Sequence, residues 1–267
     1  MKVLMINLDG SKDRLQQQNE QFDKLKVVFE RLPAVSIADF SKDDYQKLAF
    51  NGQRSMKQSE LACFLSHKKA WEYVVTLNEP CVVLEDDAVL VREFKQIINA
   101  VTNLENIDFI NLEVHGRKKL IAKSATFDLT DDHFRLFSLY QDRSGTGGYI
   151  LYPSGARKLL DFMEKRAIGL ADEFIYSCRS LEAYQIEPAV LLQSDKCEMY
   201  GVKPMDDMHS IIGQVKNTVS FELSIIEKIQ FKYRRIIAQI ILGYYYLLFM
   251  CKGAVKREIK VEPKRFD

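Results

Sequence analysis

The chain has 267 residues, of which 47% are hydrophobic, a proportion typical of a globular protein with a full core in one large domain or two small ones. The net charge of +1 is unevenly distributed: the residues from Lys228 onward carry ten Lys and Arg against three Asp and Glu, or +7, and the rest carries 28 against 34, or −6. The body is mildly acidic and the tail is basic, which points to an anionic partner for the tail. We expect no nucleic-acid partner.

Five cysteines, an odd number without the spacing of metal ligands, argue against a secreted disulfide scaffold. Cys63 and Cys81 lie within apolar runs, as buried structural thiols do. The N-terminal stretch 1–7 has too short an apolar run for a signal peptide. We therefore expect a protein of the reducing cytosol.

Segments typical of strands and of helices alternate along the first 190 residues. Apolar or alternating runs predict strands at 2–8, 27–31, 81–85, 107–113, 134–140, 149–152 and 183–193. Apolar residues three and four apart, with turn and cap signals, predict helices at 11–26, 39–50, 58–77, 89–101, 153–165 and from 169. This alternation predicts an α/β fold with a mostly parallel sheet flanked by helices.

The first predicted strand ends in the turn-forming run Asn7-Leu8-Asp9-Gly10-Ser11. Arg14 would then lie in the first turn of the next helix, an unfavourable place for a cation because a helix N-terminus favours anions. A bound phosphate or nucleotide would relieve that cost. The alternative is a solvated arginine on the surface.

The clearest helix, 58–77, has an apolar pattern that Ser66 and His67 interrupt. A lone histidine in a helix is usually structural or solvated. His67 gains functional interest if the helix lies beside a strand edge that carries carboxylates, where the ring could donate to a phosphate or adjust a ligand.

Three adjacent carboxylates, Glu85-Asp86-Asp87, follow the apolar run 81–84. In open α/β sheets, ligands bind at the carboxyl edge of the strands. Neighbouring anions repel one another unless a cation lies among them, and magnesium and manganese prefer carboxylate oxygens. The triplet therefore indicates a divalent cation that bridges to a diphosphate; the alternative is an ordinary acidic turn.

Further polar residues accompany the later strands. Glu113 ends the strand at 107–113, and a glycine-rich run, 144–148, precedes the strand at 149–152. Glycines let a backbone approach a ligand closely, but this run lacks the spacing and the Lys-Ser/Thr pair of a phosphate-binding P-loop. Asp172 lies at the start of the last predicted helix, where it is either a helix cap or a functional carboxylate.

Five segments together resemble glycosyltransferase family 25, the enzymes of lipopolysaccharide and lipooligosaccharide biosynthesis, especially their β-galactosyltransferases. They are 6–9 with Asp13-Arg14, 59–67 with Ala70-Trp71, 84–87, 145–150 and 171–174. Their order and spacing match the family over roughly residues 1–195. The resemblance implies a GT-A fold, a nucleotide-sugar donor and a divalent metal, Mn²⁺ or Mg²⁺.

The resemblance also implies roles for individual residues. Glu85 and Asp87 match the metal-binding end of the family's DxD-type motif, here written Glu-Asp-Asp. The implied nucleotide-sugar pocket contains Asn7, Leu8, Asp9, Arg14, Ser66, His67, Glu85, Asp86 and Asp87. The implied sugar or acceptor contacts are Thr146, Gly147, Gly148 and Tyr149. No motif carries over beyond about residue 200, and Asp195 and His209 are candidates for a late metal ligand.

The chemistry of a sugar diphosphate adds two requirements. The leaving diphosphate needs a metal beside it, and an inverting displacement needs a base at the opposite face of the sugar. Asp172 is our first candidate for the base and Glu113 the second. We expect an inverting enzyme that moves a hexose, most readily galactose, from a UDP-sugar to a lipopolysaccharide or lipooligosaccharide core saccharide.

Two other functions compete with this expectation. A sugar-phosphate nucleotidyltransferase would use the same strand-edge carboxylates, but it typically has an early glycine-rich, basic loop that the run 7–11 does not match. A membrane-associated scaffold of the same fold would have lost turnover. The presence of Glu85, Asp87, Asp172 and His67 argues against the scaffold.

The pattern changes at residue 225, so we predict a glycosyltransferase domain over 1–200 and a helical extension over 201–267. Residues 236–251 are apolar with three tyrosines and flanking cations, but they fall short of the ~20 residues that span a bilayer. This pattern favours a helix on the inner face of the bacterial cytoplasmic membrane, beside a lipid-linked oligosaccharide acceptor. The alternative is a helix that packs on the domain or in a homodimer.

Overall fold

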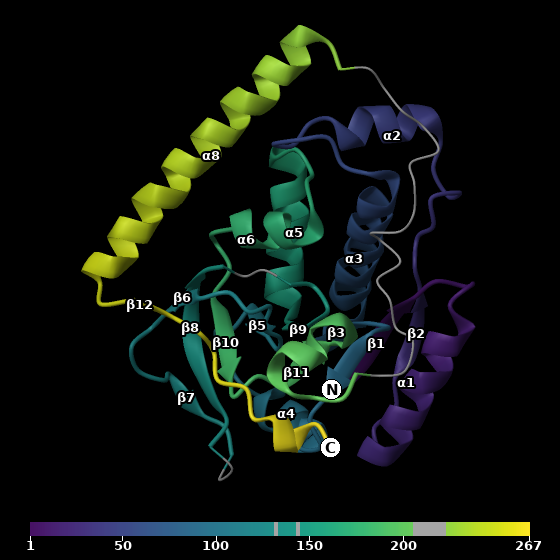
Figure 1. The fold of residues 1–267 in the computed structure, drawn as a ribbon, viewed down its shortest axis with the longest axis vertical. Helices are drawn as coiled ribbons and strands as arrows, with labels where there is room; N and C mark the ends of the chain where they lie inside the picture. Colours follow the sequence, from purple (N-terminus) through teal and green to yellow (C-terminus); the bar gives the residue numbers. More distant parts are fainter. Residues whose placement is uncertain (131–132, 143–144, 205–222) are drawn as a thin grey trace.

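A ten-stranded sheet with helices on both faces forms the body of the protein, and the long helix α8 lies outside α5 and α6 (Figure 1). The structure is a computed structural model that describes residues 1–130, 133–142, 145–204 and 223–267. The strands are β1 (Lys2–Asn7), β2 (Glu30–Pro33), β3 (Cys81–Glu85), β4 (Ala88–Leu90), β5 (Phe109–Asn111), β6 (Lys119–Ile121), β7 (Phe127–Asp128), β8 (Arg135–Gln141), β9 (Gly148–Leu151), β10 (Ala183–Glu187), β11 (Leu191–Gln193) and β12 (Val255–Arg257). The helices are α1 (Lys12–Leu25), α2 (Lys42–Ala49), α3 (Gln58–Leu77), α4 (Phe94–Val101), α5 (Pro153–Lys165), α6 (Ala171–Ser177) and α8 (Ile225–Cys251), with short 3₁₀ helices η1 (Ser194–Tyr200) and η2 (Pro263–Arg265).

The α/β class is confirmed, but the sheet is mixed rather than mostly parallel. Its strand order is β12-β6-β8-β10-β5-β9-β3-β1-β2, with β7 beside β8. Parallel pairs join β1 to β2 and β3, and β10 to β5. The other pairs of this sheet are antiparallel. The described chain between β5 and β9 contains strands and loops but no helix, so it supplies no helical crossover of the kind that joins parallel neighbours. Parallel strands need a long crossover connection, whereas antiparallel neighbours do not.

Strand β9 decides the geometry of the sheet edge. It runs antiparallel between β3 and β5, with Gly148 opposite Leu84 and Tyr149 opposite Asn111. The start of β9 therefore lies where β3 and β5 end. Strand β1 ends at the same edge, because Ile6 is opposite Glu85. The loop before β9 is thus placed between the acidic triplet and the residues that follow β5.

Two buried clusters, one on each face of the sheet, hold the helices in place. Successive side chains of a strand point to opposite faces, and accordingly Val83 packs in the cluster of Trp71, while Leu84 packs in the cluster of Phe94. The first cluster joins α3, α5 and α6 to the sheet, and the second joins α1 and α4. Helix α3 has the predicted bounds, and Phe64 and Trp71 are fully buried.

The last residues of the chain pack on the body. Strand β12 pairs with β6 at the edge of the sheet. The two terminal nitrogens of the Arg257 guanidinium, Nη1 and Nη2, donate to the carboxylate of Glu187, at 2.5 and 2.6 Å. Arg265 pairs with Glu93 at the start of α4. The predicted extension over 201–267 therefore contains, within its described part, α8 and a final segment that completes the sheet.

We expect Glu187→Gln to lower the free energy of unfolding by about 1–3 kcal/mol at neutral pH, the usual effect of losing hydrogen bonds to a charged group. Burial opposes ionisation of Glu187, but hydrogen bonds from Arg257 and from the Lys260 N–H outweigh it and lower the pKa of Glu187. A lowered pKa gives stability at neutral pH that is lost as the pH falls through the folded value. Urea unfolding should therefore separate the two proteins at neutral pH, and the difference should disappear in acid once Glu187 is protonated in the folded protein.

Glu258→Gln is the matched control for this experiment, because Glu258 is exposed and lies beside Arg257 in the chain. The control should unfold like the parent protein at both pH values. A Glu187→Gln protein as stable as the control at neutral pH would show that the final segment contributes little to the stability of the body.

Helix α8 has 27 residues and is longer than the apolar stretch 236–251. It begins at Ile225 because Ser224 and Glu227 form a capping box, in which Ser224 Oγ accepts from the Glu227 N–H and the Glu227 carboxylate accepts from the Ser224 N–H. By length and composition alone, it is the one helix in the described part of the chain that could cross a membrane. No residue of α8 is fully buried.

Candidate active site

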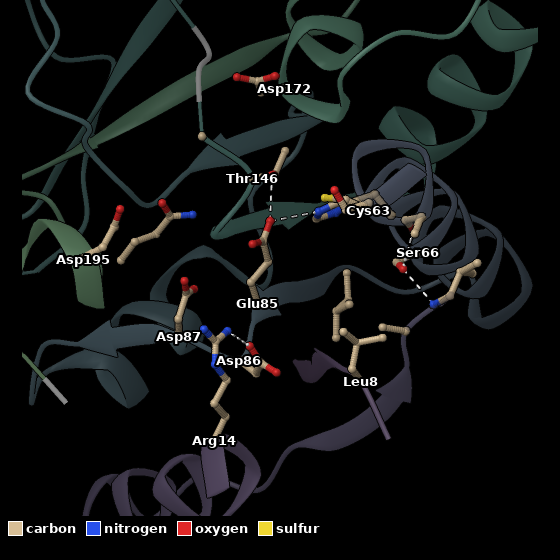
Figure 2. Close-up of a pocket in the computed structure, with 18 of the residues that line it drawn as sticks. Leu8, Arg14, Cys63, Ser66, Glu85, Asp86, Asp87, Thr146, Asp172 and Asp195 are labelled. Atoms are coloured by element: carbon tan, nitrogen blue, oxygen red, sulfur yellow. Dashed lines mark hydrogen bonds and ion pairs between the residues drawn. The ribbon is translucent and has the colours of Figure 1, made fainter. Parts of the chain in front are cut away.

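A cavity of about 790 Å³ opens at the edge of the sheet where β1 and β3 end. Figure 2 shows Glu85 between Asp87 on one side and Asp172 on the other. Nine of the residues predicted from the sequence line this cavity: Leu8, Arg14, Ser66, His67, Glu85, Asp86, Asp87, Thr146 and Asp172. The fold thus brings together residues from all five of the motif-bearing segments.

Asp86 is held by the last residue of β1 and by the first turn of α1. Asn7 Nδ2 donates to Asp86 Oδ2 and Arg14 Nη1 donates to Asp86 Oδ1, both over 2.7 Å. Burial raises the pKa of Asp86 even though Arg14 and Asn7 oppose that rise. The carboxylate of Asp86 therefore offsets the unfavourable position of Arg14 at a helix N-terminus.

One carboxylate oxygen of Asp87 is a candidate ligand for a cation. Its Oδ1 is buried and has no hydrogen-bond partner among the residues that the structure describes. Burial and repulsion from Glu85 raise the pKa of Asp87 to about 8. An unpaired buried carboxylate is costly, and a divalent cation bound by oxygen ligands is a suitable partner. Glu85 and Asp87 thus fit the metal that the family resemblance implies.

Glu85 is oriented by side chains from β9, its preceding loop and α3. Thr146 Oγ1 donates to Glu85 Oε1 over 2.8 Å, and His67 Nε2 lies 3.2 Å from the same oxygen. Tyr149 Oη contacts His67 Nδ1 at 2.9 Å and accepts from Trp71 Nε1 at 3.0 Å. Burial would raise the pKa of Glu85, but hydrogen bonds from His67 and Thr146 lower it. Glu85 is therefore an oriented anion.

Cys63, His67 and Glu85 form a second group whose ligand-type atoms all lie within 4.8 Å of one another. Sulfur and nitrogen ligands would suit zinc rather than manganese or magnesium. However, Tyr149 and Glu85 already engage the two ring nitrogens of His67. Burial also raises the pKa of the Cys63 thiol well above its ordinary value, which keeps the thiol protonated. Hydrogen bonding therefore accounts for this group without a metal.

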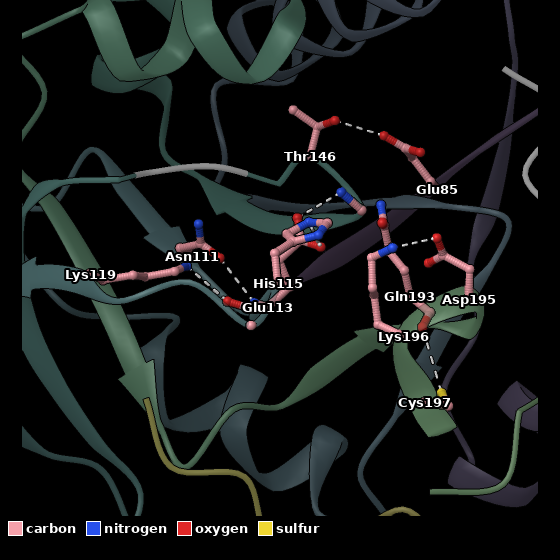
Figure 3. A network of polar contacts seen from close by, with 12 residues as sticks. Glu85, Asn111, Glu113, His115, Lys119, Thr146, Gln193, Asp195, Lys196 and Cys197 are labelled. Carbon is pink, nitrogen blue, oxygen red and sulfur yellow. Dashed lines mark hydrogen bonds and ion pairs between the residues drawn. The ribbon is translucent and has the colours of Figure 1, made fainter. Parts of the chain in front are cut away.

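Glu113 lies behind the cavity wall and is fully buried. Its Oε1 accepts from the Gly147 N–H over 2.8 Å, and its Oε2 lies 3.0 Å from His115 Nε2. Lys119 Nζ donates to the main-chain oxygen of Glu113 over 2.9 Å (Figure 3). Burial opposes protonation of His115, but Glu113 outweighs it and raises the pKa of His115. His115 lines the cavity. Glu113 therefore contacts two parts of the cavity wall, His115 and the loop before β9.

Asp172 lies in the first turn of α6, and Leu170 is the N-cap of that helix. Asp172 Oδ1 accepts from the Glu173 N–H over 2.7 Å, and the side chain lines the cavity. Phe174 fixes α6 on α3, because its ring stacks on Trp71 with centroids 5.8 Å apart. Asp172 is therefore a carboxylate held at the cavity wall by a packed helix, and it is separate from the acidic triplet.

Six predicted residues do not line the cavity. Asn7, Glu113, Gly147, Gly148 and Tyr149 are buried behind its wall, and Asp9 is exposed and pairs with Arg31. Gly148 is needed for packing, because a Cβ there would lie 2.2 Å from Leu191 Cδ1. The candidate ligand His209 lies outside the described residues.

Several lining residues were missed by the sequence analysis. His115, Arg117, Gln193 and Lys196 line the cavity, as does Asp195, which was only a candidate for a late metal ligand. Asp195 Oδ2 accepts from Lys196 Nζ over 2.7 Å. The run 193–196 is polar and directly follows the apolar run 189–192, just as the acidic triplet follows 81–84. That pattern was the available signal.

We expect Gly145→Ala to disturb the cavity wall and to reduce activity. Gly145 has φ +95°, and a Cβ there would lie 2.2 Å from Glu113 Oε1 and 2.5 Å from His115 Nε2. Backbone strain of this kind costs about 1–3 kcal/mol, and displacement of the buried Glu113 side chain adds to it. Thermal unfolding and transfer rates measure the two effects.

Gly253→Ala separates strain from collision, because Gly253 also has a positive φ, +84°, but a Cβ there would meet nothing within 4 Å. The control should lose stability through strain alone and keep its activity. Equal losses of stability in the two variants would show that a Cβ at position 145 does not collide with Glu113 and His115.

Comparison with known proteins gives a family match. The model of glycosyltransferase family 25, described as an LPS biosynthesis protein, matches residues 1–175. A putative glycosyltransferase of Haemophilus influenzae is 22% identical over 246 residues, covering 87% of this chain and 83% of that protein. Procollagen galactosyltransferase 1-B of Xenopus laevis is 25% identical over 220 residues, covering 71% of this chain and 35% of that protein.

Other relatives are much longer than this chain, and the solved structures superpose on it with low TM-scores. Glycosyltransferase 25 family members of insects, such as that of Aedes aegypti at 28% identity, are longer proteins, and the chain spans about 30% of their length. A Drosophila β-1,4-galactosyltransferase 7 variant, solved with manganese, UDP-galactose and xylobiose, aligns with a TM-score of 0.37 and 8% identity over 83% of this chain and 82% of that one. The family model covers most of the body and all but the last of the cavity-lining segments. The chain belongs to glycosyltransferase family 25.

Proposed function

We propose that the chain transfers a hexose, galactose in the first place, from a UDP-sugar to a saccharide of the lipopolysaccharide or lipooligosaccharide core, with inversion at the anomeric carbon. One observation carries the proposal: an acidic triplet and a separate carboxylate, Asp172, line the same cavity, and one oxygen of Asp87 has no hydrogen-bond partner among the described residues. The family description names LPS biosynthesis, and one relative is a galactosyltransferase, which supports the substrate class and the sugar.

The donor half of the site would be formed by the triplet and the cations near it. Glu85 and Asp87 would hold Mn²⁺ or Mg²⁺, which when bound supplies positive charge for the leaving diphosphate. Arg14 and Lys196 line the same cavity, and cations suit phosphate oxygens. The buried bonds from Thr146 and His67 keep Glu85 oriented before the donor binds.

The acceptor half would be formed around Asp172. Its carboxylate takes the proton of the acceptor hydroxyl while the hydroxyl oxygen bonds to the anomeric carbon, and the bond between that carbon and the diphosphate oxygen breaks. Asp172 suits this task because it lies on α6, apart from the triplet at the end of β3. Glu113 supports the site from behind through His115.

The test is a screen of UDP-sugars with Mn²⁺, with saccharide acceptors and with product analysis. The proposal predicts release of UDP and a glycosylated product, with UDP-galactose as the best donor. Release of pyrophosphate from a nucleotide and a sugar phosphate would identify the rival nucleotidyltransferase. If the protein shows no transfer and no donor hydrolysis above background, it is an inactive scaffold.

A further inference from the structure

Exposed apolar side chains concentrate on α8. Of the thirteen large hydrophobic side chains that are exposed in the described part of the chain, eleven lie on this one helix. They are Ile225, Ile226, Ile229, Tyr233, Ile236, Ile237, Ile240, Leu242, Tyr244, Leu247 and Met250. Soluble monomers rarely expose a contiguous apolar surface of this kind unless it binds something.

Seven of these side chains form one stripe along the helix. The stripe consists of Ile226, Ile229, Tyr233, Ile236, Ile240, Tyr244 and Leu247, three or four residues apart, which places them on one face of an α-helix. Ile240 and Tyr244, near its middle, are each 62% exposed, and Leu247 is 65% exposed. We call this face the outer stripe.

The opposite face of α8 is attached to the body at Arg234, in the first half of the helix, and at Tyr245 and Phe249, near its C-terminal end. Arg234 Nη1 donates to the main-chain oxygen of Phe50 over 3.1 Å. The ring of Phe249 stacks on Tyr140 at 4.5 Å, and the Arg179 guanidinium lies 3.8 Å from the ring centroid of Tyr245. Arg234 and Phe249 are about 22 Å apart along the helix axis at 1.5 Å per residue. The helix therefore lies along the body, and the outer stripe points away from it.

Positive charge accompanies the outer stripe. Lys228, Lys232 and Arg235 are exposed and follow one another at helical spacing beside it. The single acidic residue of α8 is Glu227, and its carboxylate accepts from the Ser224 N–H and hydroxyl at the helix start. An apolar stripe with cations at its edge matches a bilayer of anionic lipids, because the negative surface of such a bilayer attracts basic residues beside it.

A second copy of the chain matches this face less well. Two copies that paired through their outer stripes would bring Lys228, Lys232 and Arg235 toward an interface in which α8 offers no free acidic partner. Like charges without partners oppose association.

We propose that the outer stripe of α8 binds the surface of an anionic lipid bilayer, with the helix parallel to the membrane plane and the body on the aqueous side. A crossing orientation conflicts with the attachments at Arg234 and Phe249, which would draw the body toward the ~30 Å hydrocarbon core. This proposal is independent of the proposed reaction, because binding to lipid needs no turnover.

Vesicle flotation of the full chain tests the proposal. The vesicles contain phosphatidylcholine alone or phosphatidylcholine with phosphatidylglycerol, at low and at high salt. We expect flotation with the anionic vesicles, and we expect it to weaken at high salt because salt screens exposed charges. Deleting the tail is unsuitable, since it would also remove β12 and the Arg257–Glu187 pair.

Two sets of substitutions test the stripe and its cations. The triple variant Ile229→Gln, Ile240→Gln, Leu247→Gln should abolish flotation, and Lys228→Gln, Lys232→Gln, Arg235→Gln should weaken it at least tenfold. The matched control is Lys24→Gln, Lys95→Gln, Lys123→Gln, which removes three exposed lysines elsewhere and should float like the parent. Circular dichroism confirms that each variant is folded.

Other outcomes would overturn the proposal. A dimer in sedimentation, lost in the Ile229/Ile240/Leu247 variant and accompanied by no flotation, would assign the outer stripe to a second copy. Membrane-bound protein that resists extraction by alkaline carbonate would assign α8 to a crossing orientation. Flotation that is equal in the apolar variant and the parent would exclude the stripe as the binding surface.

Discussion

Asp87→Asn should reduce metal-dependent transfer by on the order of 10²-fold or more, because a bound metal supplies several kcal/mol of charge stabilisation and each ~1.4 kcal/mol is a factor of ten. The variant should also lose manganese-dependent binding of UDP in calorimetry. Its unfolding temperature without metal should not fall, because Asn has nearly the same shape and Asp87 Oδ1 has no hydrogen-bond partner among the described residues that the change would remove. Burial and Glu85 already disfavour ionisation of Asp87 and raise its pKa to about 8. The measurements of UDP binding and of unfolding temperature together distinguish the loss of a metal ligand from the loss of folded structure.

Asp43→Asn is the control for the same chemical change, at an exposed position in the first turn of α2. It should bind UDP and turn over like the parent. Full manganese-dependent turnover by Asp87→Asn would remove Asp87 from the metal site. A large fall in its unfolding temperature would instead mean that Asp87 has a structural partner.

Asp172→Asn should lower kcat by on the order of 10²–10⁴-fold, the usual contribution of a general base. The Kd for the UDP-sugar should barely change, because Asp172 lies on α6 and the proposed donor ligands follow β3. Steady-state kinetics with a soluble acceptor gives kcat, and calorimetry gives the donor Kd. A base also predicts that the residual rate is less dependent on pH in the variant.

Glu173→Gln is the neighbouring control. Glu173 occupies the same turn of α6 but lines a different cavity of about 490 Å³, between α6 and α8. The control should keep its kcat. If Asp172→Asn weakens donor binding instead of kcat, Asp172 is a binding residue. If Glu113→Gln is the more severe change, the assignments of base and supporting residue are exchanged.

The local pattern was sufficient for much of the fold. Helix 58–77 is predicted at its observed bounds because most of its apolar residues recur three and four apart, despite the interruption at Ser66 and His67, and because turn signals follow it. The strand before Glu85 was recognisable because a buried strand forms an apolar run with polar residues at its end. Asp87 and Arg14 are recognisable as site candidates for the same reason, because each lies just after a strand, and the end of a strand and the turn that follows are local features of the sequence. The family motifs are local too, so the family was recognisable from the sequence.

Only the tertiary structure decided how these pieces meet. Strand order and direction depend on partners far apart in the chain, and the antiparallel insertion of β9 between β3 and β5 is what places Thr146 against Glu85 and Gly147 against Glu113. The burial of Glu113 and the exposure of His115 to the cavity follow from that insertion. The sequence likewise does not decide which face of α8 packs on the body, because apolar residues occur all around that helix. In the folded protein, contacts with residues such as Tyr140 determine the inner face.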